Sequence, residues 1–382
     1  MTKNQFLSGN EACVLAAINA GAGFFSGYPI SPATEIAEMR STLMPANNGI
    51  FIQMEDEIGA IAAVIGASLG GTKAFTATSG PGLALMQENI GFAAMAEVPC
   101  VIINVQRFGP STGIATKPAQ SDVMAVRWGS PGDHSLIVLA PSSVQECFNL
   151  TVEAFNLSER FRTPVIVLFD AVIAHLREKA EIKEPKELKL FQRKKPSGLI
   201  NTYLPYRPVH NDIPVLSNFG DEHILRVTGL VHDEGGYSSS HPQTAEELVQ
   251  RLARKIENYQ EELPPPVFYG KPDAEIMVIS YGISARAAHE AVFRVNKEGL
   301  SSGMLQLCTL WPFPQEIVKE TCTAAKNILV AEMNRGQIRQ QVLTCGFPPE
   351  KVKGVNKLNT EVITPTEIVS AIKEVHKNNV HN

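Results

Sequence analysis

The chain has 382 residues, of which 44% are hydrophobic and 19% charged, which excludes a disordered or fibrous protein and suggests about two or three domains. Its formal net charge of −5 gives no basic footprint for a phosphate backbone, so nucleic acid is excluded as the main partner. No apolar run approaches the roughly 18 residues of a membrane span and the N-terminus has no signal-peptide pattern, so we expect a cytoplasmic chain without a membrane partner.

The six cysteines are far apart in the sequence, at positions 13, 100, 147, 308, 322 and 345, and no two form a C-x-x-C pair. A zinc site or an iron–sulfur cluster held by this chain alone is therefore not expected, and we assign the chain no metal ligands. Most of the cysteines lie within apolar patterns, which predicts reduced cysteines in the core.

The first 180 residues alternate short apolar runs with helical patterns. Strands are predicted at 24–25, 50–52, 73–78, 100–105, 136–139 and 164–169. Helices are predicted from about Ala33, over 57–69, from Ser79-Gly80 and from Ser142 or Ser143. Gly70-Gly71 stops the second of these helices, and Gln145 and Glu146 are placed to close a capping box at the last. The alternation predicts βαβ units, with a parallel sheet covered by helices on both faces.

Residues 183–263 are predicted to be a linker followed by one amphipathic helix. The part over 183–242 combines a mixed charge run with scattered prolines and no sustained period. We interpret its Lys/Arg-rich run as a solvated tether that wraps the surface, in preference to a docking patch for an acidic partner. Thr244 is expected to cap the helix, with Glu247 three positions on. The apolar stripe of this helix has the helical period and consists of Ala245, Leu248, Val249, Leu252, Ile256 and Tyr259.

Residues 264–382 begin a second α/β unit after three consecutive prolines. Strands are predicted at 276–279, 303–307 and 328–331, and helices at 284–295, near Gln315 and ending near Val375. Thr364 and Pro365 are the expected N-cap and first residue of the last helix. The predicted fold class is therefore α/β, with two doubly wound parallel-sheet domains in residues 1–182 and 264–382.

Open parallel sheets bind ligands beyond the carboxyl ends of their strands, and three loops in residues 1–182 follow predicted strands. In the first, Tyr28-Pro29-Ile30-Ser31-Pro32 forms a stiff turn that presents Ser31 at a helix start, where backbone N–H groups favour an anion. Residue types alone favour a simpler interpretation, in which Ser31 caps the helix and Pro32 is its first residue.

The second loop ends in three acids, Glu55, Asp56 and Glu57. Their attraction to the dipole of the helix that follows is one explanation for them. That helix is almost entirely small and apolar, so it can pack closely and carry one of the acids into a buried site. A buried carboxyl group has a raised pKa and can share a proton with a ring nitrogen.

In the third loop, Arg107 stands at the end of a buried strand and is followed by glycines and hydroxyl residues. Its guanidinium can grip a carboxylate with two parallel hydrogen bonds, and the loop allows a backbone approach to the same anion. A structural arginine that pairs with a helix end is the alternative, and the spacing does not separate the two.

Taken together, these loops are more specific than any one of them. In chain order they read Gly27-Tyr-Pro-Ile-Ser-Pro, Gln53-Met-Glu-Asp-Glu-Ile-Gly-Ala, Thr76-Ala-Thr-Ser-Gly-Pro-Gly and Gln106-Arg-Phe-Gly-Pro-Ser-Thr-Gly. This order resembles the alpha subunit of the 2-oxoacid:ferredoxin oxidoreductases, with the 2-oxoglutarate branch as the best match. The likeness continues in Val227-Thr-Gly-Leu-Val-His-Asp-Glu and Leu310-Trp-Pro-Phe-Pro, so it covers nearly the whole chain.

The resemblance implies a thiamine diphosphate enzyme divided among subunits. This chain would provide a pyrimidine-side thiamine diphosphate domain in 1–182 and a transketolase C-terminal-like domain in 264–382. A beta subunit would share the thiamine diphosphate and hold Mg²⁺ and an iron–sulfur cluster, in agreement with a sequence that has no Gly-Asp-Gly motif followed by an Asn pair. A separate gamma subunit is implied, and some assemblies add a ferredoxin-like delta subunit. The implied reaction converts 2-oxoglutarate and CoA to succinyl-CoA and CO₂ with reduction of ferredoxin, or runs in reverse as a carboxylation.

The resemblance also implies roles for individual residues. Glu57 matches the glutamate that bonds N1′ of the aminopyrimidine, and Tyr28 and Pro29 match positions that contact the cofactor. Ser31 and Arg107 match the hydroxyl residue and the arginine that hold the substrate carboxylate. Ser31 departs from the commoner Thr, which keeps the hydroxyl group and drops a methyl group.

Two residues beyond the third loop complete the predicted substrate site. Thr116 matches a further substrate-side threonine of the family. The second carboxylate of 2-oxoglutarate would be costly to bury unpaired, and Arg107 is already assigned to the first. We therefore predict that Lys117 brings its ammonium group over the pocket. A solvent-facing Lys117, with the cation supplied by the beta subunit, is the alternative.

Three other functions stay open at the level of sequence. One is a branched-chain or pyruvate-specific relative, although the branched-chain branch commonly lacks the Ser111-Thr112 pair. Another is the pyrimidine-domain subunit of a lipoate-linked 2-oxoacid dehydrogenase, which has a similar two-domain plan. The third is a non-catalytic scaffold of the same fold, against which the retention of Glu57 and Arg107 argues.

Overall fold

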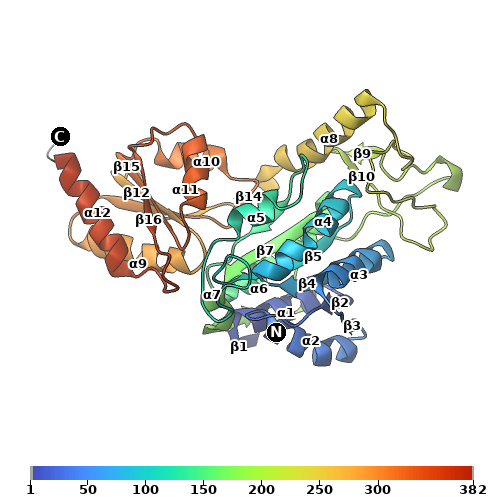
Figure 1. The fold of residues 1–382 in the computed structure, drawn as a ribbon, viewed down its shortest axis with the longest axis horizontal. Coiled ribbons are helices and arrows are strands. Elements are labelled where there is room, and N and C mark those ends of the chain that lie inside the picture. Colours follow the sequence, from blue (N-terminus) through green and yellow to red (C-terminus); the bar gives the residue numbers. More distant parts are fainter. Residues whose placement is uncertain (1–2, 381–382) are drawn as a thin grey trace.

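A seven-stranded sheet forms the centre of the N-terminal part, in the blue-to-green region of Figure 1. The computed structural model describes residues 3–380. The strand order is β14-β6-β7-β5-β4-β2-β3, and every neighbouring pair except β14–β6 is parallel. The bounds are β2 (Phe24–Gly27), β3 (Ile50–Gln53), β4 (Ala74–Thr78), β5 (Cys100–Gln106), β6 (Ile137–Leu139), β7 (Pro164–Asp170) and β14 (Thr309–Trp311). The predicted parallel sheet is confirmed, with an antiparallel strand added at one edge.

Helices cover both faces of this sheet, as the alternating pattern predicts. On one face lie α3 (Glu57–Leu69) and α4 (Gly80–Met95), and on the other lie α1 (Gly9–Asn19), α2 (Thr34–Ala46) and α6 (Val144–Phe161). Two short helices, α5 (Val123–Trp128) and α7 (Ala171–His175), follow β5 and β7 along the chain. Because both faces are covered, every residue of β5 and β7 is buried.

A five-stranded sheet forms the C-terminal part, in orange and red in Figure 1. Its order is β11-β13-β12-β15-β16, in which only β11 is antiparallel to its neighbour. The bounds are β11 (Val267–Gly270), β12 (Ile276–Ser280), β13 (Ser302–Gln306), β15 (Asn327–Glu332), β16 (Val352–Asn356), α9 (Gly282–Lys297), α10 (Gln315–Cys322), α11 (Gln337–Thr344) and α12 (Pro365–Val380). The apolar cluster under α3 and α4 continues through Trp311 into this sheet, so the two parts share a core.

The middle of the chain wraps the surface of the N-terminal part and ends in α8 and the short helix η3. Its elements are β8 (Arg177–Ile182), η1 (Pro185–Glu187), η2 (Ile200–Thr202), β9 (Pro208–His210), β10 (Ile213–Pro214), α8 (Pro242–Glu257) and η3 (Gln260–Glu262). The strand β8 pairs antiparallel with β1 (Lys3–Ser8). The predicted stripe of α8 is buried at Leu248, Leu252 and Ile256. The boundaries at 182 and 263 stay predictions.

Two predicted helix caps are wrong. The helix α8 begins at Pro242 and not after Thr244, because the fixed φ of proline suits the first helical position. The residue before α2 is Ala33, so Ser31 and Pro32 lie in the preceding turn and do not cap the helix.

Two other predicted caps are confirmed, one with a change in detail. The Ser143 hydroxyl caps α6 by accepting from the Glu146 N–H at 3.1 Å, but the Glu146 carboxylate accepts from the N–H of Ser142. Thr364 caps α12 by accepting from the Glu367 N–H at 3.3 Å. That helix continues beyond the expected end near Val375.

The remaining expectations concern cysteines and membranes. All six cysteines are free and buried, as predicted. Within residues 3–380, no helix combines the length and apolar character that crossing a membrane requires. The same residues contain no group of three or more His, Cys, Asp or Glu side chains arranged to hold a metal ion.

Candidate active site

Glu57 is the one buried acid of the three that precede α3. The Asp56 carboxylate caps the helix by accepting from the Gly59 N–H at 2.7 Å, and Glu55 is exposed. The Glu57 side chain is 4% exposed. Burial raises its pKa, and this outweighs the lowering by its own backbone N–H and by the charge of Arg107. The prediction that this helix carries an acid into a buried site is confirmed.

Gly82, in the first turn of α4, leaves the space that the Glu57 carboxyl group occupies. A Cβ atom on Gly82 would lie 2.3 Å from Oε1 of Glu57 and 2.2 Å from Oγ1 of Thr78. Cβ atoms in proteins essentially never lie this close to another heavy atom, so any side chain at position 82 would push the Glu57 carboxyl group away. The Gly-Pro-Gly sequence that opens α4 therefore fixes where the Glu57 carboxyl group can lie.

Arg107 joins two of the predicted loops at the end of β5. Its Nη1 donates to the carbonyl oxygen of Ser31 at 2.8 Å, and its Nη2 donates to that of Thr112 at 2.9 Å. Its Nε is buried without a hydrogen-bond partner in the described part of the chain. Burial lowers the pKa of Arg107, while the charges of Asp122 and Glu57 raise it. The side chain braces the Ser31 turn, and its Nε–H is left for another acceptor.

The other predicted site residues lie at the surface around this arginine. Tyr28, Pro29 and Ser31 are exposed on the turn after β2. Thr116 and Lys117 are exposed in the loop after β5, whose base is closed by a hydrogen bond of 2.8 Å from the Phe108 N–H to the Lys117 carbonyl oxygen. The structure thus brings Ser31 and Arg107 together, with Lys117 beside the residue that follows Arg107.

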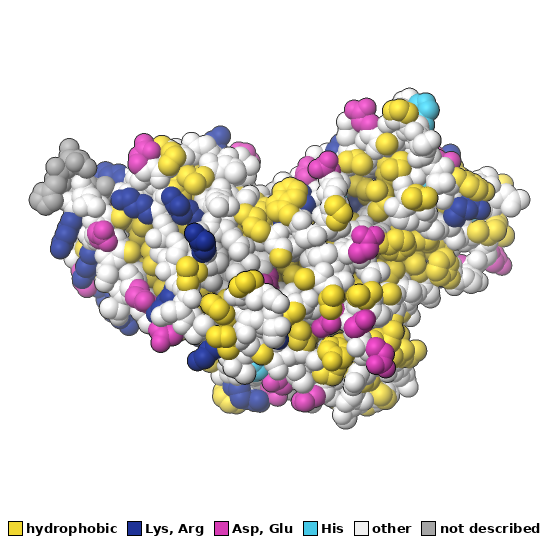
Figure 2. All heavy atoms as spheres, viewed as in Figure 1, with side chains coloured by type: hydrophobic (Ala, Val, Ile, Leu, Met, Phe, Trp, Pro, Cys, Tyr) yellow, Lys and Arg dark blue, Asp and Glu magenta, His cyan; other side chains and the backbone are white. Residues whose placement is uncertain are grey.

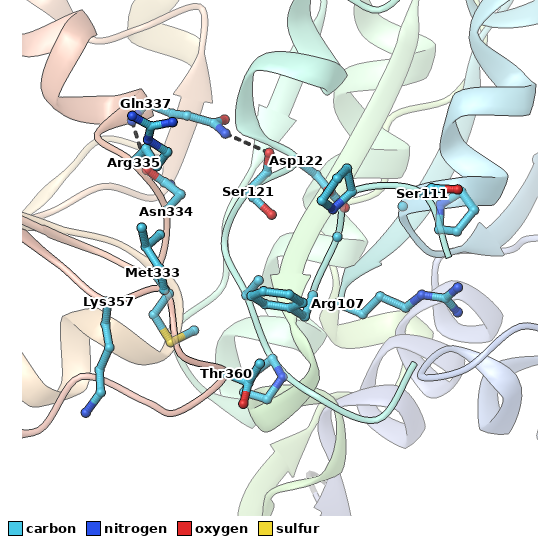
Figure 3. Close-up of a pocket in the computed structure, with 18 of the residues that line it drawn as sticks. Arg107, Ser111, Ser121, Asp122, Met333, Asn334, Arg335, Gln337, Lys357 and Thr360 are labelled. Carbon is cyan, nitrogen blue, oxygen red and sulfur yellow. Dashed lines mark hydrogen bonds between the residues drawn. The ribbon is translucent and has the colours of Figure 1, made fainter. Parts of the chain in front are cut away.

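A cavity of about 490 Å³ lies between the N-terminal and C-terminal parts. Arg107 and Asp122 line one wall, and Asn334, Arg335 and Gln337 line the other, as Figure 3 shows. The side chains of Thr116 and Lys117 do not line it. The cavity therefore borders Arg107 on the side that faces the C-terminal part, and Figure 3 shows its guanidinium pointing away from that part.

Several buried polar atoms near the strand ends have no hydrogen-bond partner among the described residues. They are Ser26 Oγ, Thr76 Oγ1, Ser79 Oγ, Asn104 Oδ1, Gln106 Nε2 and Arg107 Nε. A buried polar atom without a partner costs free energy, and folded proteins contain few of them. Their concentration at the carboxyl ends of β2, β4 and β5 indicates a site that is completed by water, a ligand or another chain.

Asp122, Asn104 and Gln106 were not predicted from the sequence. Asp122 Oδ2 accepts from Asn104 Nδ2 at 2.9 Å, and the Asp122 N–H donates to Gln106 Oε1 at 3.1 Å. A signal was present, because Asn104 and Gln106 are polar residues in a strand that is otherwise apolar and fully buried.

Together these features define an α/β protein whose candidate active site carries a buried acid and a braced arginine at the strand ends. The chain belongs to the family of pyruvate flavodoxin/ferredoxin oxidoreductases. Residues 15–251 match the thiamine diphosphate-binding domain of that family, and residues 274–368 match pyruvate:ferredoxin oxidoreductase core domain II.

Named relatives extend over nearly the whole chain. The chain is 46% identical over 373 residues to the 2-oxoglutarate synthase subunit KorA of Methanothermobacter marburgensis, covering 97% of this chain and 99% of the relative. It is 34% identical to the ketoisovalerate oxidoreductase subunit VorB of Methanothermobacter thermautotrophicus, covering 97% of each. Both relatives are named as subunits, so proteins of this kind work in assemblies of more than one chain.

Solved structures agree with the family assignment. The 2-oxoglutarate:ferredoxin oxidoreductase of Magnetococcus marinus, solved with 2-oxoglutarate, coenzyme A and succinyl-CoA bound, matches with a TM-score of 0.93 at 34% identity. The match covers 97% of this chain but only 65% of that one. A split-gene transketolase, described as an inactive beta4 tetramer, shares the fold with a TM-score of 0.56 at 13% identity.

Proposed function

We propose that this chain is the alpha subunit of a 2-oxoglutarate:ferredoxin oxidoreductase that uses thiamine diphosphate and CoA. The reaction is the oxidative decarboxylation of 2-oxoglutarate to succinyl-CoA and CO₂ with reduction of ferredoxin, or its reverse. The observation that carries the proposal is the buried Glu57 carboxyl group, with its raised pKa, against the first turn of α4. The relatives named 2-oxoglutarate synthase support the substrate.

The residues around Glu57 fit the pyrimidine end of thiamine diphosphate. When bound, the cofactor supplies a nucleophilic carbon that attacks the keto group and accepts the electron pair left by CO₂. Glu57 would hold a proton at N1′ of the aminopyrimidine, a task for which its raised pKa suits it. Gly82 keeps the carboxyl group in place, and the exposed Tyr28 and Pro29 would contact the ring.

Arg107, Ser31 and Thr116 would receive the carboxylate beside the keto group. Arg107 has its buried Nε free of protein acceptors in the described chain, while its Nη1 holds the Ser31 turn and its Nη2 holds the carbonyl oxygen of Thr112. The carbonyl oxygens that hold the guanidinium are neutral, so they do not compensate its charge. Lys117 would meet the distal carboxylate from the loop beside Phe108.

A beta subunit would complete the site over the face around Glu57, sharing thiamine diphosphate and supplying Mg²⁺ and an iron–sulfur cluster. Large apolar side chains are exposed on that face, and Figure 2 shows apolar groups gathered on the side of α3 and α4. They are Ile50 and Ile52 on β3, Ile58 on α3 and Leu85 on α4. Exposed apolar patches of this kind are typical of interfaces. A separate gamma subunit, in some assemblies with a ferredoxin-like delta subunit, would accompany the alpha and beta subunits, and ferredoxin would accept the electrons.

The test is an assay of the complex of this chain with its partner subunits. We expect CoA-dependent reduction of ferredoxin or a viologen dye with 2-oxoglutarate, and much less with pyruvate or 3-methyl-2-oxobutanoate. Glu57→Gln should lower kcat by about 10²- to 10⁴-fold, because glutamine cannot hold the proton. The matched control is Glu55→Gln, an exposed acid two residues away that should leave turnover unchanged. A faster reaction with the branched substrate, or the opposite result for the two acids, would contradict the proposal.

A further inference from the structure

Asp122 is a carboxyl group in the active-site region to which neither the family comparison nor the proposed mechanism gives a role. It lies at the end of the loop that begins with Arg107, and the two line the same wall of the cavity of about 490 Å³, as Figure 3 shows. A Cβ atom on Gly80 would lie 3.6 Å from both of its carboxylate oxygens, so the group packs against the start of α4. Glu57 occupies the other side of that turn, at Gly82.

The position of Asp122 is fixed from both parts of the chain. On the N-terminal side it is held by its hydrogen bonds with Asn104 and Gln106. On the C-terminal side, Gln337 donates to the Ser121 carbonyl oxygen at 2.8 Å and accepts from the Met124 N–H at 2.9 Å. Because Ser121 and Met124, on either side of Asp122 in the sequence, are both hydrogen-bonded to Gln337, the carboxyl group is held at the cavity wall.

The charges that face Asp122 come from three directions. Arg107 faces Asp122 from the end of β5, and the charged residues Arg335, Lys357 and Glu361 line the opposite wall of the cavity. Glu57 lies across the first turn of α4. The buried Glu332 carboxylate lies behind this wall and accepts from the N–H groups of Ile338 and Arg339. Neutral groups complete the surroundings, namely Gly80, Pro81, Asn104, Gln106, Tyr281, Asn334 and Gln337.

These surroundings make the Asp122 carboxyl group easy to protonate. Burial raises its pKa to about 6, although the hydrogen bond from Asn104 and the charge of Arg107 act in the other direction. Above pH 6 the carboxylate is ionised and partly neutralises Arg107. An incoming carboxylate then meets a negative charge beside its binding partner, and protonation of Asp122 removes that repulsion.

We propose that Asp122 takes up one proton when the carboxylate of a 2-oxo acid binds at Arg107, and thereby links substrate affinity to pH. The proton comes from solvent and returns to it when the anion leaves, so no other reactant is needed. This inference rests on the proposed role of Arg107 as the partner of the substrate carboxylate.

The experiment measures the inhibition constant of 2-hydroxyglutarate, a dicarboxylate that does not react, against 2-oxoglutarate in the complete complex between pH 5.5 and 8. For the wild type we expect this constant to rise about tenfold, with the rise beginning near pH 6. Asp122→Asn should remove the rise and keep the low inhibition constant at pH 8. Asp133→Asn, which changes an exposed acid outside the cavity, should retain the wild-type profile.

A second variant keeps the inference testable if Asp122→Asn fails to assemble. Asn104→Ala removes the hydrogen bond that lowers the pKa of Asp122, so the rise should begin at a higher pH. Arg107→Gln separates the two proposals, because it should weaken the inhibitor at every pH. If Arg107→Gln has no effect, the proposed role of Arg107 is wrong. If it weakens binding while Asp122→Asn keeps the wild-type pH profile, or while Asn104→Ala leaves the onset unchanged, the inference about Asp122 is overturned.

Discussion

The buried charges that tie α8 to the N-terminal part can be tested with the substitution Glu97→Gln. Glu97 lies just after α4, and its side chain is fully buried. Its carboxylate accepts hydrogen bonds from Arg251 at 2.6 and 3.1 Å and from Lys255 at 2.9 Å, both on α8. Burial raises the pKa of Glu97, but Arg251, Lys255 and Arg162 outweigh burial and hold the pKa well below its ordinary value. The group is therefore ionised at neutral pH, and glutamine removes its charge.

The distances between these buried charges set how much free energy of unfolding the substitution Glu97→Gln should remove. Two unit charges about 4 Å apart attract each other by about 4 kcal/mol at an effective dielectric constant of about 20, and desolvation offsets part of this gain. Removing one partner of a buried pair costs about 3–5 kcal/mol, because the other charge stays buried without compensation. Burial lowers the pKa of Lys255 to about 8 even though the charge of Glu97 raises it, so without Glu97 the loss of its proton at pH 7 costs less than about 1.4 kcal/mol. Arg251 cannot lose its proton, so it accounts for most of the loss.

We expect Glu97→Gln to lower the free energy of unfolding by about 3–5 kcal/mol at pH 7, measured by urea denaturation followed by circular dichroism. Adding Arg251→Met should recover more of this loss than adding Lys255→Met. The stability of the single variant should rise from pH 7 to pH 9, because folded Lys255 binds fewer protons than the unfolded chain, whose lysines have pKa values near 10.4. A loss below about 1 kcal/mol, or equal recovery by the two second substitutions, would refute the reasoning.

Two further expectations concern the divided active site. Purified without its partners, the chain should bind thiamine diphosphate weakly and show no 2-oxoglutarate-dependent dye reduction, since the beta subunit would hold the diphosphate and Mg²⁺; turnover by the isolated chain would rule out a divided site. Gly82→Ala should lower kcat of the complex about as strongly as Glu57→Gln, because its methyl group would lie 2.3 Å from the Glu57 carboxyl oxygen. Gly66→Ala on α3, where nothing lies within 4 Å, is the control, and normal turnover of Gly82→Ala would contradict the role of the glycine.

The parts of the fold that local sequence determines were predictable. The strands β5 and β7 are covered on both faces, so their sequences are continuous apolar runs. The edge strands β14 and β16 were not predicted. Only three residues form β14, and its position depends on the pairing of Thr309 with Leu139, which are far apart in the sequence. The edge strand β16 reads Val-Lys-Gly-Val-Asn and is only partly buried, so it has no distinct apolar pattern.

The candidate site also has one part that local sequence determines and another that it does not. The burial of Glu57 follows from its own helix, whose small apolar residues allow close packing against α4. The wall that contains Asp122 depends on contacts between residues about 200 positions apart. Gln120, two residues before it, donates to the Tyr281 carbonyl oxygen at 2.9 Å and through its backbone N–H to that of Met333 at 3.1 Å. No local pattern contains this information, because it arises when the two sheets pack together.

Substrate choice depends on where the second carboxylate of 2-oxoglutarate finds a cation. The Lys117 side chain is exposed, and its backbone is bonded to Phe108, the neighbour of Arg107. From that point we expect its four-carbon stem to bring the ammonium group back over the pocket. We therefore expect Lys117→Met to lower kcat/KM for 2-oxoglutarate by one or two powers of ten, since a desolvated charge loses its partner.

The comparison with a monocarboxylate decides this last prediction. With 2-oxobutyrate, which has no distal carboxylate, Lys117→Met should leave kcat/KM nearly unchanged, because Arg107 still meets the carboxylate beside the keto group. Lys183→Met, at an exposed position on the linker, is the control and should change neither substrate. If Lys117→Met affects both acids equally, it perturbs the loop as a whole and not the distal carboxylate. If it affects neither, Lys117 faces solvent, and the cation that selects 2-oxoglutarate belongs to the beta subunit.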